Sequence, residues 1–210
     1  MCGKLNEMEA ELKELAVALF DIGAVKFTEV TLQNGWKTPI YMDLRVTISY
    51  PKILRKLSQT LWKLAKDSKN IAHICGVPYT ALPFATVISV EANMPMLIKR
   101  KEAKSYGTKK LIEGNFESGD KCVIIEDVIV LGSSALETIN DLRNSGLKVT
   151  EVFVVVDREQ GGRENLQNEN VEVRSLFTIS QLMKYLLDAE KITLEVMEEI
   201  MGYISKNKAH

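Results

Sequence analysis

The spacing of apolar residues in the first third of the chain is typical of helices. Leucine and alanine residues at intervals of three and four predict an amphipathic helix over residues 8–22. A second helix is predicted over residues 51–68, with Pro51 near its first turn, where proline is favoured. These two helices enclose a segment with a different pattern.

Between the two predicted helices, apolar and polar residues alternate as they do in β-strands. The segment KFTEVTL (26–32) predicts one strand, and IYMDL (40–44) predicts its partner. The turn between them, NGWKTP (34–39), contains the Asn-Gly pair that favours a tight hairpin. We therefore expect a small β-hairpin near the N-terminus.

From residue 71 onward, short apolar runs alternate with stretches of helical periodicity. Strands that are buried on both faces and alternate with helices are typical of a parallel sheet. We predict one α/β domain with a mostly parallel central sheet flanked by helices. The predicted strands are residues 71–77, 96–98, 122–128, 152–157 and 171–178, and the predicted helices are 80–92, 134–144 and 163–168, with one or two more over 180–203.

A basic segment, KRKEAKSYGTKKLIEG (99–114), interrupts this alternation. A solvated loop is the ordinary explanation for such a run of lysines and arginines. The segment nevertheless begins at the C-terminal end of a predicted parallel strand, which is where open α/β sheets bind ligands. We therefore treat it as a candidate ligand-binding loop.

Composition narrows the class of protein. The chain has 210 residues, 46% of them hydrophobic, and a net charge of −1. No apolar run is long enough to cross a membrane, and the acidic N-terminus does not resemble a targeting peptide, so we expect a cytoplasmic protein without a membrane partner. The near-neutral charge, with no aromatic platform beside the lysines, argues against nucleic acid as a partner.

Cysteine and histidine residues do not indicate a metal site or a catalytic triad. The three cysteines lack the ligand spacing of zinc sites, and we expect Cys75 and Cys122 to be buried free thiols. His73 is expected to be a strand residue with a local hydrogen-bond partner, and His210 is the last residue of the chain.

Two adjacent acids, Glu126 and Asp127, follow an apolar run, and Gly132 follows them before a helix predicted to begin near Ser134. Carboxylates accept hydrogen bonds from hydroxyl groups or bind a metal, whereas the free N–H groups at a helix start bind anions. A glycine also lets the backbone approach a phosphate closely. A sugar phosphate would suit both groups, while the absence of GKS, GKT and GxGxxG argues against nucleotide loops of those types.

The stretch EDVIVLGSS (126–134) resembles the phosphoribosyl-pyrophosphate motif of type I phosphoribosyltransferases. Other segments resemble the orotate phosphoribosyltransferases, most closely the N-terminal half of animal UMP synthases. The likeness extends from about residue 10 to about residue 205, and it implies the type I phosphoribosyltransferase fold in a single domain over 1–210, with a hood at about 1–45 and without a decarboxylase domain. The segments that carry it are PIYMDLR (39–45), CGVPYTALP (75–83), RKEAKSYGTKKLIEG (100–114) and VVVDREQGG (154–162).

The resemblance implies a reaction and its partners. Ribose 5-phosphate would pass from phosphoribosyl pyrophosphate (PRPP) to orotate, giving orotidine 5′-monophosphate and pyrophosphate for UMP biosynthesis. Mg²⁺ would be required, carried by PRPP or pyrophosphate rather than by a metal site of the protein. The active form would be a homodimer that shares the loop 99–114 between subunits.

The resemblance also assigns roles to individual residues. Glu126 and Asp127 would hold the ribose hydroxyls, and the turn residues Gly132, Ser133 and Ser134 would bind the 5′-phosphate. The catalytic residues would be Arg100, Lys101 and Lys104, which close over the pyrophosphate. The remaining substrate-binding residues would be Lys26 near orotate and pyrophosphate, Tyr41 beside the base, Tyr79 and Thr80 at the pyrophosphate, and Tyr106 through its hydroxyl.

Arg158 matches the arginine that pairs with the orotate carboxylate. A planar guanidinium grips a carboxylate with two parallel hydrogen bonds, which suits a carboxylated pyrimidine better than a purine. The alternative is a surface ion pair with Asp157 or Glu159. Gly161 and Gly162 are expected to form a turn behind this arginine.

Val130 and Leu131 depart from the family pattern, which has threonine and a small residue at these positions. One hydroxyl donor is therefore missing, and a hydrogen bond to a charged group contributes roughly 1.5–3 kcal/mol. This leaves an alternative to the enzyme: a phosphoribosyltransferase fold of low or no activity, kept as a binding or regulatory subunit. The retained lysines, acids and Arg158 favour an active enzyme.

Overall fold

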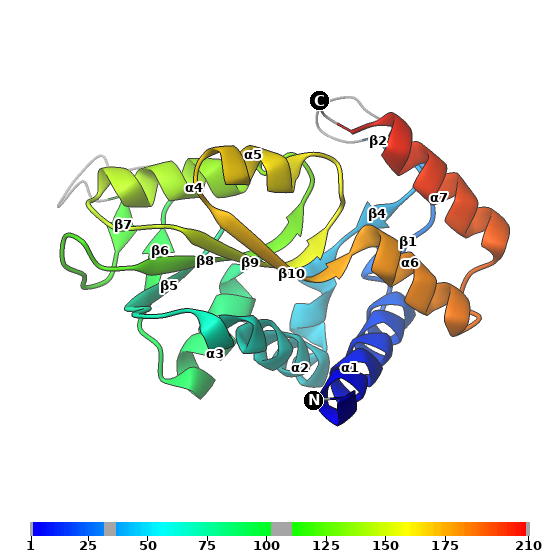
Figure 1. The fold of residues 1–210 in the computed structure, drawn as a ribbon, viewed down its shortest axis with the longest axis horizontal. Helices are drawn as coiled ribbons and strands as arrows, with labels where there is room; N and C mark the ends of the chain where they lie inside the picture. The colour runs from blue at the N-terminus through cyan, green and yellow to red at the C-terminus, as the bar shows by residue number, and fades with distance from the viewer. Residues whose placement is uncertain (1, 32–36, 102–110, 209–210) are drawn as a thin grey trace.

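The computed structural model describes residues 2–31, 37–101 and 111–208, and its centre is one six-stranded sheet (Figure 1). The strand order is β10-β9-β8-β5-β6-β7. Neighbouring strands are parallel except for the pair β6–β7, which is antiparallel. The strands are β5 (His73–Gly76), β6 (Met96–Lys99), β7 (Ile112–Glu113), β8 (Cys122–Ile129), β9 (Glu151–Asp157) and β10 (Glu172–Thr178).

Helices cover both faces of the sheet, as the alternating pattern predicts (Figure 1). One face carries α2 (Pro51–Trp62) and α3 (Leu82–Ala92), and the other carries α4 (Ser133–Asn144) and α5 (Gly162–Asn168). After β10 the chain forms two helices, α6 (Ile179–Asp188) and α7 (Leu194–Lys206), and α1 (Cys2–Asp21) packs against α6. Two 3-10 segments, η1 (Leu44–Ser49) and η2 (Lys63–Asp67), flank α2.

The interior of the sheet consists of the continuous apolar runs. Residues 123–125 of β8 and 152–156 of β9 have no exposed surface. Burying one such valine, isoleucine or phenylalanine side chain contributes roughly 1.5–3 kcal/mol, which explains why these runs read as continuous rather than alternating.

The N-terminal hairpin forms with the predicted pairing but in two short ladders. β1 (Val25–Lys26) pairs with β4 (Tyr41–Met42), and β2 (Val30–Thr31) pairs with β3 (Lys37–Thr38). The prediction of two continuous strands over 26–32 and 40–44 was therefore wrong. Pro39 has no N–H to donate to a ladder, and Leu44 begins η1. The Asn34-Gly35 turn lies outside the described residues.

The order of the sheet reverses between β5 and β8. From β5 the chain moves outward to β6, and it then returns to the other side of β5 with β8, followed by β9 and β10. Open α/β sheets bind ligands at such a switch point, outside the C-terminal ends of the strands. Gly76 pairs with both Ile98 and Ile125, so that Val77, Lys99 and Glu126 begin the same edge.

The predictions for His73, Cys75 and Cys122 agree with the structure. His73 Nε2 lies 2.9 Å from Asp120 Oδ2, which is its local partner. Cys75 and Cys122 are buried free thiols, and burial raises the pKa of Cys75 to about 11. Among the described residues, no helix combines the length and the apolar character that crossing a bilayer requires.

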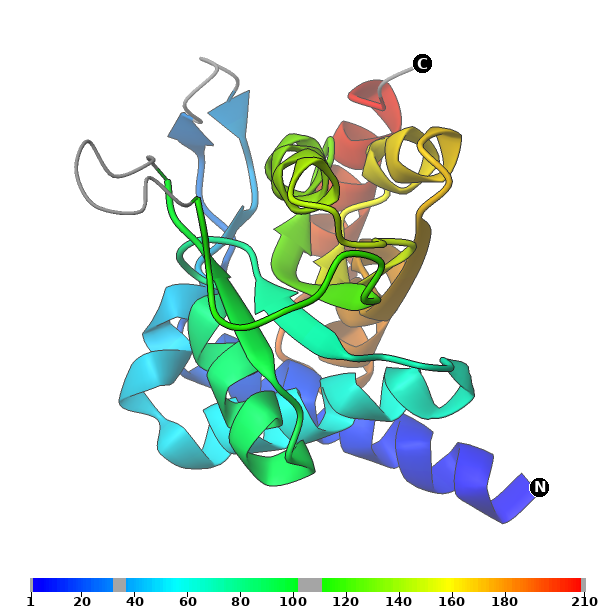
Figure 2. The ribbon, with the colours of Figure 1, turned by 90° about the vertical axis from the view of Figure 1, so that its left-hand side faces the viewer.

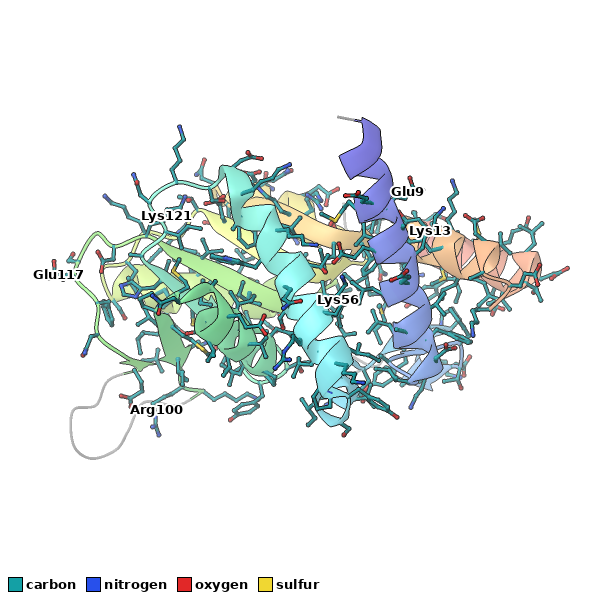
Figure 3. The ribbon with its side chains drawn as sticks, turned by 90° about the horizontal axis from the view of Figure 1, so that it is seen from below. Glu9, Lys13, Lys56, Arg100, Glu117 and Lys121 are labelled. Atoms are coloured by element: carbon teal, nitrogen blue, oxygen red, sulfur yellow. The ribbon has the colours of Figure 1, made fainter. Side chains whose placement is uncertain are left out.

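The partly buried carboxylate of Glu11 joins α1 to α2, which lie side by side in Figure 3. Glu11 accepts hydrogen bonds from Lys56 (2.8 Å), Lys63 (2.6 Å) and the Thr60 hydroxyl (2.8 Å). Burial by itself raises the pKa of Glu11, but these three donors outweigh it and lower the pKa to about 2. The ionised form is therefore the one that the fold stabilises.

We predict that Glu11→Gln lowers the free energy of unfolding at pH 7 by about 1 kcal/mol, a modest value because both lysines are half exposed to screening solvent. A lowered pKa stabilises the fold above the unfolded value of 4.5, and this contribution is lost as the pH falls towards about 2. Urea unfolding curves of variant and wild type should therefore converge over that range.

The matched control is Glu9→Gln on the same helix. Glu9 and Lys13 form an exposed pair at 3.3 Å, and we expect its loss to change stability by less than about 0.5 kcal/mol (Figure 3). If the difference in free energy of unfolding between Glu11→Gln and the wild type stayed constant down to pH 3, the carboxylate charge would not be what stabilises the contact.

Candidate ligand site at the switch point

Four segments meet at the C-terminal edge of the sheet. They are residues 77–81 after β5, 99–101 after β6, 126–134 from β8 into α4, and 157–162 from β9 into α5. Figure 2 shows the N-terminal hairpin on one side of this edge and α4 and α5 on the other. Most of the predicted substrate-binding residues belong to these segments.

The acids Glu126 and Asp127 lie inside β8, which continues to Ile129 rather than ending at the acids. Glu126 is only 4% exposed, and its Oε1 accepts a hydrogen bond from the Asp127 N–H at 3.0 Å. Burial first, and the neighbouring Asp127 charge second, raise the pKa of Glu126 well above its usual value. Hydroxyl donors or a cation beside Glu126 and Asp127 would stabilise their ionised forms.

The turn after the acids has the geometry of an anion site. Gly132 has φ of +78°, a left-handed conformation that glycine adopts readily, and α4 begins at the next residue. The first backbone bond of the helix runs from Leu136 N–H to Gly132 O at 2.9 Å. The N–H groups of the first turn have no acceptor within the helix, and the exposed hydroxyls of Ser133 and Ser134 lie beside them.

Helix α5 holds this turn in place. A Cβ atom on Gly162 would overlap Ile129 and would lie 2.7 Å from the Val130 carbonyl oxygen. Asn165 of the same helix donates from Nδ2 to the Leu131 carbonyl oxygen at 3.0 Å. Gly162 thus packs directly against the turn, a role that sequence reasoning missed because a glycine pair indicates only a bend.

The same contacts bear on the missing threonine. Val130 and Leu131 are half-buried, and the carbonyl of Leu131 is fixed by Asn165 rather than by a hydroxyl of the turn itself. The backbone donors at the start of α4 do not depend on these two side chains. The departure from the family pattern therefore removes one hydroxyl without removing the anion site.

Arg158 is a buried cation, 4% exposed, directly after β9. Its Nη2 donates to the Thr38 hydroxyl of the hairpin at 3.2 Å, and its Nε has no hydrogen-bond partner among the described residues. The alternative of a surface ion pair was wrong, because Asp157 pairs with Arg163 (2.8 Å) and Glu159 accepts bonds from Ser180.

Burial lowers the pKa of Arg158, and only Tyr203 of α7 opposes this change. Burying a guanidinium without an anion costs several kcal/mol, so such an arrangement is typical of a binding site rather than of a structural ion pair. Thr38 and Tyr203 also line a cavity of about 640 Å³ between the hairpin and α7.

The basic segment divides into residues with different surroundings. Lys99 is buried and bonds Glu137 (2.6 Å) and Asp141 (2.9 Å) of α4. Burial lowers the pKa of Lys99, but these two bonds outweigh burial and raise it. Lys99 is therefore a structural link. Arg100 begins the stem of the loop, where its N–H donates to the Leu111 carbonyl at 2.9 Å.

Lys101 is the exposed residue at the end of this stem, and it reaches the segment after β5. Its Nζ lies 4.6 Å from the centroid of the Tyr79 ring, which is 64% exposed, and Thr80 beside it is half-buried. The structure thus brings together a predicted catalytic lysine and a predicted pyrophosphate residue. Lys104 and Tyr106 lie outside the described residues.

Lys26 and Tyr41 face each other across the hairpin pair β1–β4. Lys26 is exposed, whereas Tyr41 is half-buried and its hydroxyl accepts a hydrogen bond from Arg45 Nη2 at 2.8 Å. Met42, next to Tyr41, packs against the core. Both predicted residues belong to the hairpin that Thr38 ties to Arg158.

Comparison with known proteins gives relatives over most of the chain, although no family model matches it. The uridine 5′-monophosphate synthase of Bos taurus is 46% identical over 200 residues, which are 95% of this chain and 42% of the relative. The orotate phosphoribosyltransferase of Caenorhabditis elegans is 39% identical over 189 residues, which are 90% of this chain and 83% of the relative. The chain thus spans less than half of the bovine protein and most of the nematode one.

Solved structures agree. The UMP synthase of Leishmania donovani matches with a TM-score of 0.85 and 34% identity, over 92% of this chain and 42% of that one. The orotate phosphoribosyltransferase of Mycobacterium tuberculosis in complex with PRPP matches with a TM-score of 0.66 and 26% identity, over 82% of this chain and 98% of that one.

The packing of α5 against the phosphate turn yields a testable prediction. Gly162→Ala should lower the free energy of unfolding by about 1–3 kcal/mol, because its Cβ would displace backbone atoms of the turn. The measurement is urea unfolding, together with the thermal shift caused by inorganic phosphate, which should shrink.

Gly202→Ala in α7 is the matched control, since nothing lies within 4 Å of the Cβ that it would add. We expect it to be neutral or to stabilise by up to about 1 kcal/mol. Equal stability of the two alanine variants would show that the turn does not need a glycine against it.

Proposed function

The chain belongs to the orotate phosphoribosyltransferase family, and we propose that it catalyses Mg²⁺-dependent transfer of ribose 5-phosphate from PRPP to orotate in pyrimidine biosynthesis. The observation that carries this proposal is the buried Arg158, a cation without a carboxylate partner among the described residues, next to an anion-binding turn. The two anion sites match the carboxylate of orotate and the 5′-phosphate of PRPP.

The ribose-phosphate half of the substrate would lie along β8 and the start of α4. Glu126 and Asp127 would accept hydrogen bonds from the ribose hydroxyls, which would lessen the mutual repulsion that raises the pKa of Glu126. The 5′-phosphate would bind the backbone N–H groups and hydroxyls at Ser133 and Ser134, where the helix dipole favours negative charge.

The base would lie beside Arg158, with the hairpin residues Tyr41 and Lys26 on its other side. The Thr38 bond uses one nitrogen of the guanidinium, and the Nε position has no described partner, so that donors remain for a carboxylate. A purine has no carboxylate to compensate this buried cation. The site therefore favours orotate over adenine, guanine or hypoxanthine.

The leaving pyrophosphate would lie between segment 77–81 and the basic loop. The transition state has oxocarbenium character, with negative charge growing on the pyrophosphate, so that catalysis depends on positioned cations more than on proton transfer. Lys101, Arg100 and Lys104 would supply that charge, Thr80 and Tyr106 would complete the contacts, and the Tyr79 ring would lie against Lys101. Orotate attacks through a ring nitrogen and needs little help from a general base.

Mg²⁺ would enter with the substrate. No group of three potential protein ligands occurs in the described part of the chain, and Mg²⁺ commonly binds one or two carboxylates together with substrate phosphates. The half-buried Asp127 and its neighbour Glu126 fit that mode. When bound, the ion would neutralise part of the pyrophosphate charge, and the residues above would orient the two substrates around it.

We also propose that the enzyme is a homodimer of the cytoplasm. Large apolar side chains are exposed on η1, α3 and β6, namely Ile48 (58%), Val90 (77%) and Ile98 (45%). Ile98 lies one residue before Lys99, so a partner docked there would meet the basic loop. The buried free thiols Cys75 and Cys122 suit a reducing compartment.

The test of function is the decrease in orotate absorbance with PRPP and Mg²⁺, which should require all three components. Arg158→Gln should raise the KM for orotate roughly 10- to 150-fold, as expected for the loss of a charged hydrogen-bonded pair, and leave the KM for PRPP nearly unchanged. Its melting temperature without substrates should hold or rise, because a buried unpaired charge is removed.

If Arg158 had only a structural role, Arg158→Gln should lower the melting temperature and raise the KM for orotate and the KM for PRPP equally. Turnover of a purine base in place of orotate would overturn the proposed substrate.

The dimer is tested by mixing two variants at an orotate concentration far below the KM of Arg158→Gln, where each variant alone has little activity. If the loop of one subunit acts in the site of the other, Lys104→Ala and Arg158→Gln should complement each other. Random pairing of equal amounts leaves one intact site in each hybrid dimer, which gives about a quarter of wild-type activity. No recovery of activity after mixing would show that the loop acts in the site of its own subunit. Val90→Asp should abolish both dimerisation and this recovery of activity.

A further inference from the structure

The contact between Lys101 and Tyr79 joins the stem of the basic loop to the segment that follows the neighbouring strand β5. The ammonium nitrogen lies 4.6 Å from the ring centroid, within the range of a cation–π interaction. The two residues follow the adjacent parallel strands β6 and β5, whose C-terminal ends are in register at Ile98 and Gly76. Tyr79 is 64% exposed and contributes little to the core.

The loop stem is fixed up to the residue before Lys101. Residues 98 and 99 pair with β7, and the Arg100 N–H donates to the Leu111 carbonyl at 2.9 Å. The buried Lys99 ties the same stem to α4 through Glu137 and Asp141. Lys101 is therefore the first side chain beyond the stem, and the Tyr79 ring is the contact that fixes its ammonium.

We infer that Tyr79 is a positioning residue whose ring holds the Lys101 ammonium beside segment 77–81, where the leaving pyrophosphate of PRPP would lie. This inference rests on the proposed function. A ring covers one side of an ammonium, and the remaining N–H donors stay available for phosphate oxygens. The pyrophosphate would approach Lys101 from the side that the ring leaves open.

The energetic advantage is that the lysine is ordered before PRPP arrives. A free lysine side chain loses rotamer entropy when it is fixed. Holding the side chain in advance moves part of this cost from the binding step to folding. The opposite arrangement, in which the ring sequesters the lysine and PRPP must displace it, predicts an opposite change in affinity.

The first experiment compares Tyr79→Leu with Tyr79→Phe. The leucine variant removes the aromatic face and should raise the KM for PRPP by about two- to fivefold, the range that corresponds to a cation–π contact at an exposed site. The KM for orotate should change little. The phenylalanine variant keeps the ring and should restore the wild-type KM. A lower KM for PRPP in Tyr79→Leu would overturn the inference.

The second experiment is a double-mutant cycle with Lys101→Met. If the ring acts through Lys101, Tyr79→Leu should cause no further loss in the Lys101→Met background. An equal loss in both backgrounds would show that Tyr79 acts independently of the lysine. Lys66→Met, an exposed lysine of η2, is the control for removal of one positive charge.

The third experiment observes the resting contact without relying on turnover. Reductive methylation with ¹³C-formaldehyde keeps the lysine charge, and the Lys101 signal is assigned by its absence in Lys101→Arg. The ring should shift this signal upfield in the wild type and in Tyr79→Phe, but not in Tyr79→Leu. Equal shifts in all three proteins would overturn the inference.

The same signal separates failure of the inference from failure of the proposed function. If the wild type turned over no orotate, titration of the Lys101 signal with PRPP and Mg²⁺ would replace KM as the measure of affinity. A ring shift in the wild type, together with weaker PRPP binding in Tyr79→Leu than in the wild type, would still support the inference. A Lys101 signal that PRPP leaves unchanged would overturn it.

Discussion

One backbone hydrogen bond links the two proposed anion sites. The Arg158 N–H donates to the Ile129 carbonyl at 2.9 Å, which continues the β8–β9 ladder one residue beyond Asp157. Because of this bond, the phosphate turn and the arginine leave the sheet side by side. A few residues after Arg158, Gly162 lies against the turn formed by residues 130–132. A molecule with an anion at each end can therefore be recognised by a frame that the sheet itself makes rigid.

Two buried charges in this frame are held at a cost to stability. Arg158 loses solvent and gains no carboxylate among the described residues, so its pKa falls, while burial and Asp127 raise the pKa of Glu126. Groups whose pKa values move towards neutrality cluster at functional sites, since a ligand can supply the missing partner. By contrast, Glu11 is partly buried beside three donors, which lower its pKa to about 2. Arg158 and Glu126 are therefore typical of a ligand-binding site, whereas Glu11 is typical of a contact that only joins helices.

The sequence was sufficient for features that depend on local pattern. Continuous apolar runs predicted β8 and β9, and Gly132 after the acids predicted the turn that leads into α4. Features that depend on contacts between distant segments were not predictable in this way. Nothing local distinguishes Lys99, which is buried against α4, from Lys101, which is exposed two residues later. The packing role of Gly162 likewise depends on residues about thirty positions earlier in the chain, Ile129 and Val130.

The difference between Lys99 and Lys101 explains how a charged loop can act with precision. Electrostatic stabilisation is effective when the charge is placed before the reaction begins, because water and side chains then need not reorganise. In this chain the antiparallel pair β6–β7 closes the loop stem, and Lys99 fixes the stem to α4. The Tyr79 ring then holds the ammonium of Lys101. Each contact restrains the group that follows it. The positive charge at the end of this series is therefore placed relative to the same α4 helix whose N-terminus forms the anion site.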